Sequence, residues 1–505
     1  MPTNHPKSLH NHHPPPSATA STLRHQLAAI DDKITCLEAQ LTLLRSKRDV
    51  LSGALNSIVY PILTIPPELT TEIFGYYVHD NERSAPAMIR NSLTVASVCR
   101  AWRAIAISSG ALWNNIESLL YFDRTNVDSS QKLLELCLSR SGNLPLDLDL
   151  TIWKSSESQS GLIMSLLTQY LSQCVNFRLL MDKTISFAVD HFREPLYSLK
   201  KLDIDRLWSR HIAQQTTITV FFDAPQLREA HIRCLSLPQI SLPWIQLTNL
   251  HLRRQSLAQC FDILGQTPIL EVLVIEPRLN STDAQDPITA PPHVLSRLRS
   301  IKLRARGSDV FLQHLTLPIL EHLSLCLSSE GVTRVKSLVA RSRCSVRTLS
   351  LHDTRPFATN GCIRSLPSLR VLTLESLHWS SSEFDQFFDC MTKDRPVPAL
   401  ESLNLEVWYH PVIDVRSLAD MLSARWTDMP GVTNIKSLSL SFDCDPKSYI
   451  FAEHGSSYNA QTVEDAVTRL RKMRREGLKI DIQSAPKWTT QYINSQMVSE
   501  IMNSP

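Results

Sequence analysis

The chain has 505 residues, 43% of them hydrophobic, and its 52 basic residues nearly balance 49 acidic ones, which leaves a net charge of +3. Such a composition is typical of a soluble globular protein with room for several domains, and the near-neutral balance argues against nucleic-acid binding. Glycine is scarce, with 12 residues, and the common phosphate-loop, hydrolase, kinase, dehydrogenase and zinc signatures are missing.

The sequence predicts neither a membrane span nor a secretory signal, because it has no long apolar stretch and the first residues lack an apolar core. Its eleven cysteines include no C-x-x-C pair, so we expect reduced thiols and no metal. We therefore expect a cytoplasmic or nuclear protein without cofactors and without membrane or nucleic-acid partners. Its function is expected to be interaction and not catalysis.

Residues 1–20 combine His, Pro, Ser and Asn with almost no apolar content, which predicts a disordered tail. Residues 21–60 change sharply, because apolar residues recur at alternating steps of four and three, as in a coiled coil. These residues are Leu23, Leu27, Ile30, Ile34, Leu37, Leu41, Leu44, Leu51, Leu55 and Ile58, with one break at Arg48. We expect a helix of about 36 residues, ended by Pro61, whose seam either associates with another chain or docks onto the protein's own body.

Residues 61–118 form a small helical unit. Pro66 and Pro67 suit a helix start, and Leu69, Ile73 and Phe74 follow on one face at helical spacing. A second helix opens near Ser92, and Leu112 and Trp113 come after it. The apolar side of this second helix is predicted to hold Val95, Val98, Cys99, Trp102, Ile105 and Ala106.

The pairing of I-P-P-E-L-x-x-E-I-F with V-A-S-V-C-R-A-W-R-x-I-A and then L-W resembles the F-box. This helical module docks substrate receptors onto the adaptor subunit of cullin-type ubiquitin ligases. With the preceding coiled coil and the later leucine-rich repeats, the chain is similar to basidiomycete F-box-like proteins. The resemblance implies an adaptor-binding surface of Pro66, Leu69, Ile73 and Phe74, which Val98, Cys99 and Trp102 pack and complete.

One departure from the F-box pattern is an insert at residues 79–91, where a short turn is usual. The insert puts docking near the cullin in doubt. The alternative is a helical hairpin that only connects the coiled coil to the next domain.

From residue 196 to 445 the unit L-x-x-L-x-L recurs ten times, with Ile, Val or Ala allowed, at spacings close to those of leucine-rich repeats. Each unit supplies one short strand whose apolar residues are buried only by stacking on its neighbours. We therefore expect an α/β fold, an irregular leucine-rich-repeat solenoid with a parallel sheet. The units begin at Leu199, Leu227, Leu247, Leu270, Leu298, Leu320, Val346, Leu369, Leu400 and Ile435.

Both ends of the solenoid are predicted to be capped. In the transition at 119–195, Leu144, Leu146, Leu148 and Leu150 alternate as in a strand, which we assign as the first, capping strand. In the cap and tail at 446–505, a helix stops before Gly477 and the run LKIDI follows as a last strand.

Residues between the apolar positions of each unit point to the concave face of the sheet. Basic residues gather there in the middle strands, which predicts a target site for an acidic or phosphorylated protein segment. The predicted site residues are His231, Arg233, His251, Arg253, Lys302 and Arg304. The alternative is a solvated face with no partner.

Two functions are therefore carried forward. The first is a substrate-recognition subunit of a cullin-type ubiquitin ligase, and the second is a non-catalytic scaffold without ligase involvement.

Overall fold

A computed structural model describes residues 20–57, 61–79, 88–116, 121–122, 127–152, 157–181, 195–206, 217–235, 237–277, 292–408, 413–426, 434–442 and 460–484. It divides into two compact units, Met1–Ile73 and Phe74–Pro505. Residues 1–19 of the predicted tail lie outside the described residues. So do residues 80–87 of the insert and the segments 443–459 and 485–505 of the predicted C-terminal region.

The first unit is dominated by one long helix, α1 (Ala20–Asn56), whose 37 residues match the expected length. It ends four residues before the predicted stop at Pro61. The reason is local: Ser57 donates from its amide to the Gly53 carbonyl at 3.1 Å and from its hydroxyl to the Ala54 carbonyl at 2.7 Å. Glycine and asparagine in the last turn are poor helix formers and favour this end.

A short 3-10 turn, η1 (Pro61–Thr64), precedes α2 (Pro67–His79). The second helix begins at Pro67, as predicted, because a proline at the first helical position loses no hydrogen bond. Glu68 lies in the first turn, where its charge complements the helix dipole.

The single helix predicted from Ser92 onward is wrong, because the chain forms two helices there, α3 (Met88–Val98) and α4 (Arg100–Ser108). Cys99 separates them with an extended backbone, φ −154° and ψ 173°. Its sulfur accepts a hydrogen bond from the Trp102 amide at 3.4 Å and so caps α4. Residues 88–91 of the insert belong to α3 and are helical.

Helices α3 and α4 belong to the second unit and pack on its first elements. The rings of Phe74 and Trp102 meet edge to face at 4.9 Å. Trp113 is fully buried, donates from its indole nitrogen to the Ala106 carbonyl at 2.7 Å, and lies under the guanidinium of Arg140. One buried core continues from α3 into the first strands.

A parallel sheet of fifteen described strands runs through the rest of the second unit. The ten predicted repeat strands are all present, and they pair in chain order with the repeats aligned, for example Leu202 beside Ala230. The ten strands are β5 (Lys201–Arg206), β6 (Glu229–Arg233), β7 (Asn249–Arg253), β8 (Val272–Glu276), β10 (Ser300–Leu303), β12 (His322–Cys326), β13 (Thr348–His352), β14 (Val371–Leu377), β15 (Ser402–Val407) and β16 (Ser437–Phe442).

The sheet begins earlier than predicted. The strand assigned as first, β3 (Leu146–Ile152), pairs with two short strands before it, β1 (Asn115–Ile116) and β2 (Tyr121–Phe122). The next strand, β4 (Cys174–Met181), joins β3 to β5. Helices α5 (Val127–Ser141) and α6 (Glu157–Thr168) connect these strands, so the described part of the region 119–195 contributes more than the one predicted strand.

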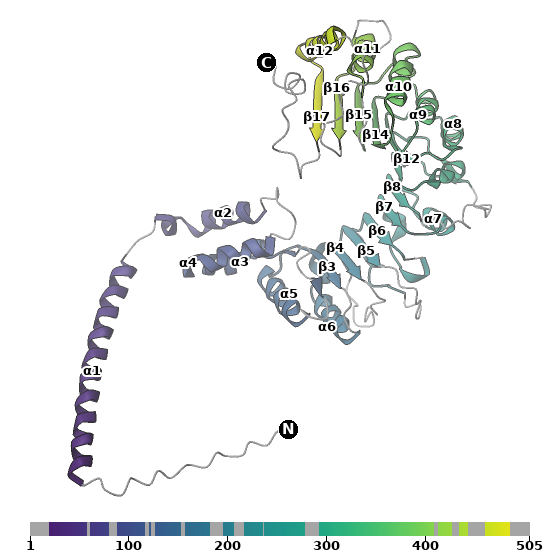
Figure 1. The fold of residues 1–505 in the computed structure, drawn as a ribbon. Helices are drawn as coiled ribbons and strands as arrows, with labels where there is room; N and C mark the ends of the chain where they lie inside the picture. Colours follow the sequence, from purple (N-terminus) through teal and green to yellow (C-terminus); the bar gives the residue numbers. More distant parts are fainter. Residues whose placement is uncertain are drawn as a thin grey trace. The chain divides into compact units, whose positions relative to one another are not determined.

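Helices cover one face of the sheet and leave the other open (Figure 1). Every second strand residue is buried under the helices, and the alternate ones face outward, as the period of two requires. We call this outward side the open face. The covering helices are α7 (Leu257–Leu264), α8 (Gly331–Ser342), α9 (Pro356–Ile363), α10 (Ser381–Lys393), α11 (Val415–Trp426) and α12 (Ala460–Arg475).

Some repeats are too short for a helix and use 3-10 turns, η6 (Leu237–Gln239), η7 (Trp244–Gln246) and η8 (Ser308–His314). A small separate sheet pairs β9 (His293–Val294) with β11 (Leu315–Thr316). At the far end α12 and the last strand, β17 (Lys479–Ser484), confirm the predicted helix and strand. Gly477 joins them at a φ of +114°, a conformation that favours glycine.

Candidate interaction surfaces

The open face is built from rows of side chains that run across the strands. Because the strands pair without a shift from β5 to β13, residues at the same position of each repeat are direct neighbours. One such row runs Asp203, His231, His251, Val274 and Lys302, and the next runs Asp205, Arg233, Arg253 and Glu276. The repeat pattern therefore determines which charges meet.

The beginning of this face is a network of ion pairs. Arg233 contacts Asp205 at 2.6 Å, and Lys201 contacts Glu229 at 2.9 Å. His231 lies between two carboxylates, with Nε2 at 2.9 Å from Glu229 and Nδ1 at 3.5 Å from Asp203. A hollow of about 330 Å³ opens beside them, lined by Asp147, Leu148, Asp149, Asn176, Phe177, Arg178, Lys201, Asp203 and His231.

Carboxylates outnumber basic groups across β3 to β6, where Asp147, Asp149, Asp203, Asp205 and Glu229 face Arg178, Lys201 and Arg233. Burial acts to raise the pKa of Asp203. The hydrogen bond and charge of His231 together with the Arg178 charge outweigh burial, so the pKa lies below its usual value. The carboxylate of Asp203 is therefore held in the charged form.

Glu276 is the centre of the next group of charges, on β7 to β10. Its carboxylate contacts Arg253 at 2.7 Å and Arg304 at 3.4 Å. Burial acts to raise the pKa of Glu276, but the hydrogen bond and charge of Arg253 lower it overall. Lys302 is exposed on β10, and Arg304 follows directly after that strand. This part of the face has more positive than negative charge.

His251 is neutral at pH 7. Burial, followed by the nearby charge of His231, lowers its pKa from 6.5 to about 4. The two imidazole rings meet edge to face at 5.2 Å. His251 can therefore offer a hydrogen bond to a partner but no positive charge.

All six residues predicted for the target site lie on the open face, but they do not form one basic patch. His231 and Arg233 are on the carboxylate-rich side, and His251 is uncharged. The remaining positive charge is on Arg253, Lys302 and Arg304 around Glu276. Acidic residues occupy the same repeat positions on neighbouring strands and pair with these basic residues. The prediction considered only the basic residues and therefore overestimated the positive charge of the site. We call β3 to β10 the charged segment of the open face.

The later strands carry hydroxyl and amide side chains instead, and we call β12 to β16 the hydroxyl segment. Ser437 donates to Ser402 at 2.8 Å, and Asn404 donates to Thr373 at 3.2 Å. Glu375 is a charged exception, and its carboxylate lies 2.9 Å from Nδ1 of His352, whose Nε2 lies 3.0 Å from the Ser324 hydroxyl. The other outward residues include Thr348, Ser350, Ser439 and Ser441.

The second candidate surface is on the helices of the motif. In the first unit, Leu69 and Ile73 lie one turn apart on α2 and are 52% and 49% exposed. In the second unit, Val98 at the end of α3 is 58% exposed. Pro66 is also exposed, Cys99 is half-buried as the cap of α4, and Trp102 is half-buried. Phe74 is different, since it is 1% exposed and packs on Trp102. Phe74 therefore belongs to the buried core and not to the exposed residues of the motif.

Sequence reasoning missed two exposed aromatic residues on the same helix, Tyr76 and Tyr77. A signal was available, because Tyr77 follows Ile73 by four residues and Tyr76 follows Leu69 by seven. Both tyrosines extend the exposed side of α2 beyond the last residue of the motif, Phe74. Aromatic side chains with a polar hydroxyl are common at protein interfaces.

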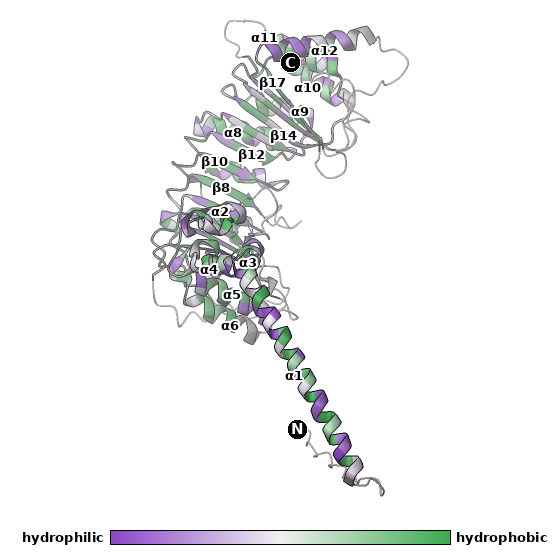
Figure 2. Cartoon of the chain, turned by 90° about the vertical axis from the view of Figure 1, so that its left-hand side faces the viewer, coloured by the Kyte–Doolittle hydropathy of each residue, from purple (hydrophilic) through white to green (hydrophobic). Residues whose placement is uncertain are grey.

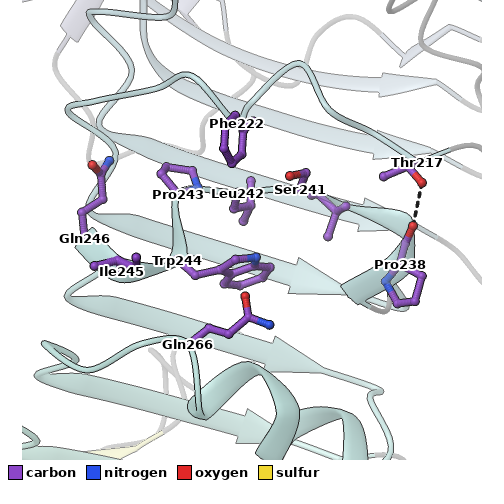
Figure 3. Close-up of a pocket in the computed structure, with 11 residues that line it drawn as sticks. Thr217, Phe222, Pro238, Ser241, Leu242, Pro243, Trp244, Ile245, Gln246 and Gln266 are labelled. Atoms are coloured by element: carbon purple, nitrogen blue, oxygen red, sulfur yellow. Dashed lines mark hydrogen bonds between the residues drawn. The ribbon is translucent and has the colours of Figure 1, made fainter.

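A second hollow, of about 660 Å³, lies among loops and not on the open face. Figure 3 shows the rings of Phe222 and Trp244 on two sides of it, with the Thr217 hydroxyl bonded to the Pro238 carbonyl at 2.7 Å. Its described lining has no charged side chain. The hollow is therefore separate in place and chemistry from the predicted target site.

No family model and no curated protein matches the chain. Among solved structures, the crystal structure of the Rad7 and Elc1 complex in yeast is similar to this chain at 14% identity and a TM-score of 0.31. The match covers 88% of this chain and 97% of that chain.

Two features are absent from the part of the chain that the structure describes. None of the helices in that part of the chain is both long and apolar enough to cross a membrane. The described His, Cys, Asp and Glu side chains also form no cluster of three suited to a metal ion.

Proposed function

We propose that this chain is a non-catalytic receptor of a cullin-type ubiquitin ligase. The helices of the F-box-like motif hold the ligase adaptor, and the open face of the sheet holds a protein target. The supporting observation is that Leu69, Ile73 and Val98 are about half exposed at motif positions, although they are large and apolar. Aliphatic side chains left in water at such positions favour association, since covering each contributes on the order of 1 to 3 kcal/mol.

Some residues of the motif pack the helices and others are exposed to solvent, and this difference supports the same function. Phe74, Trp102 and Trp113 hold the helices in place through ring packing and an indole hydrogen bond. Leu69 and Ile73 take no part in this packing, so their side chains are available to a partner. An interface of this kind needs rigid support beneath a few apolar anchors.

For the target, the open face has an excess of positive charge at one place, around Glu276. Arg304 is 52% exposed and Arg233 only 20%, so an incoming acidic or phosphorylated segment meets Lys302, Arg304 and Arg253 first. Guanidinium groups bind carboxylate and phosphate in a two-pronged geometry. Glu276 already holds Arg253 and Arg304 side by side, which reduces the conformational entropy that binding must cost.

The mechanism is proximity. Holding the adaptor and the target on one chain raises the effective concentration of target lysines near the ubiquitin-loaded enzyme. No bond is made or broken by this chain's own residues, and the proposal assigns no catalytic residue or cofactor.

The test is complex formation between the purified full chain and the purified adaptor. We expect one co-migrating species in size-exclusion chromatography with light scattering, with one adaptor per chain. The alternative, a scaffold without ligase involvement, predicts that the two proteins elute separately at all concentrations. Separate elution of a folded chain, checked by circular dichroism, would refute the receptor proposal.

A further inference from the structure

The first helix has a surface that the proposed function does not use. Every described side chain from Ser21 to Ser57 is exposed, including the leucines and isoleucines of the seam. In Figure 2 hydrophobic residues recur along α1 between hydrophilic ones. A helix in water gains most of its stability from packing of its apolar stripe, so ten turns without cover are unfavourable. The stripe requires an occupant.

The heptad positions follow from the steps of four and three. Leu27, Ile34, Leu41, Arg48 and Leu55 take the a positions, and Leu23, Ile30, Leu37, Leu44 and Leu51 take the d positions. The flanking e and g positions then determine orientation, since charges there face the partner helix. The charged residues at e are Arg24, Asp31, Glu38 and Arg45, and those at g are Lys33 and Lys47.

Charge complementarity identifies a second copy of the same chain in parallel orientation. In a parallel, in-register pair each g residue faces the e residue five positions later in the partner helix. Lys33 then faces Glu38 twice, and no g residue faces an e residue of like charge. Gln26, Gln40 and Ser52 complete the remaining pairs without repulsion.

The antiparallel arrangement about the middle of the seam is less favourable. It places Lys33 against Lys47 twice and Glu38 against Glu38, with Asp31 against Arg45 as its attractive pair. Like charges at these positions oppose pairing. In the parallel register Arg48 faces its own copy, which costs some stability, but one such polar residue at an a position disfavours shifted alignments and higher oligomers. In the single helix its guanidinium contacts Asp49 at 2.8 Å.

We propose that α1 forms a parallel, in-register, two-stranded coiled coil with α1 of a second copy. This goes beyond the proposed receptor function and does not depend on it. The dimer carries two motif surfaces and two open faces on one particle. A target with two recognition segments then binds with avidity, without any new contact on the sheet.

The first experiment measures the mass of the full chain by sedimentation equilibrium. We expect a dimer for the parent. Leu41→Asp places a charge in the seam and should weaken dimerisation at least a hundredfold. Leu43→Asp is the matched control, because Leu43 is also an exposed leucine, 57% against 47% for Leu41, but lies at a c position outside the seam; this variant should remain a dimer. A monomeric parent, a trimer, or equal behaviour of the two variants would overturn the proposal.

The second experiment tests orientation by charge exchange in the full chain. Lys33→Glu alone and Glu38→Lys alone should each weaken the dimer, by roughly fivefold to tenfold, because like charges then face each other. A mixture of the two single variants should prefer heterodimers, and the double variant should recover the parent's affinity. An antiparallel pair predicts the opposite for Lys33→Glu, which would relieve the contact with Lys47. Stronger association of that variant would overturn the parallel assignment.

Discussion

The charged and hydroxyl segments of the open face share one backbone design but differ in chemistry. In both, leucines of the repeat fill the covered face and leave alternate positions free. Ion pairs such as Arg233 with Asp205 tie neighbouring strands together in the charged segment. Neutral bonds such as Ser437 with Ser402 do so in the hydroxyl segment. The repeat therefore determines where a side chain lies, and the residue between the leucines determines what it can bind.

The largest expected difference between the segments is in stability. Asp205→Ala should lower the free energy of unfolding by about 1 to 3 kcal/mol, because Arg233 would keep a largely buried guanidinium without its carboxylate. Urea unfolding followed by circular dichroism measures this. If Asp205→Ala is as stable as the parent, the ion pairs do not tie the strands together.

The next difference concerns the target. Replacing Lys302→Glu and Arg304→Glu together should reduce target capture from lysate roughly tenfold at low salt, and less at 1 M salt, where the screening length is about 3 Å. The matched control is Arg178→Glu with Lys201→Glu, the same change of charge on the carboxylate-rich strands. Equal losses in the two double variants, with both folded, would mean that the positive charge around Glu276 is not the target site.

Acid should affect the charged segment through His251. The pKa of this imidazole is about 4 in the folded chain and 6.5 when unfolded, so the unfolded state binds more protons between these values and stability falls as the pH drops through that window. His251→Gln removes this term and should show a flatter decline between about pH 7 and pH 5. The measurement is urea unfolding at both pH values. Identical declines for variant and parent would contradict the burial of a neutral His251.

The smallest effect is expected in the hydroxyl segment. Ser437→Ala loses one neutral hydrogen bond on an accessible face and should cost at most about 0.5 to 1 kcal/mol. Unfolding in urea under the conditions used for Asp205→Ala allows direct comparison. A loss as large as that of Asp205→Ala would remove the distinction between the segments.

The ten repeat strands could be predicted because L-x-x-L-x-L is a local pattern that repeats. The strand β4 was missed because it keeps the spacing of three and two but has Cys174 and Phe177 in place of the first two leucines, with Leu179 as the third. The break between α3 and α4 was missed for another reason. The apolar spacing continues through Cys99, and only the backbone angle of that residue shows the cap.

The candidate site was predicted in position but not in charge. Aligning the repeats would have placed Asp205 beside Arg233 and Glu276 beside Arg253, because the strands pair without a shift. The lowered pKa of His251 could not be read from the sequence, since it depends on burial and on the ring of His231. Likewise, helical spacing grouped Phe74 with Leu69 and Ile73, but packing on Trp102 separates them.

Adaptor binding by the motif helices tests the receptor account most directly. Isothermal titration calorimetry compares the parent with Leu69→Ala/Ile73→Ala, and Phe357→Ala, an 89% exposed residue on α9, is the control. The account predicts that the parent and the control bind alike and that the double variant binds at least tenfold more weakly, a loss of about 1.4 kcal/mol. A folded double variant that binds the adaptor as tightly as the parent would contradict it.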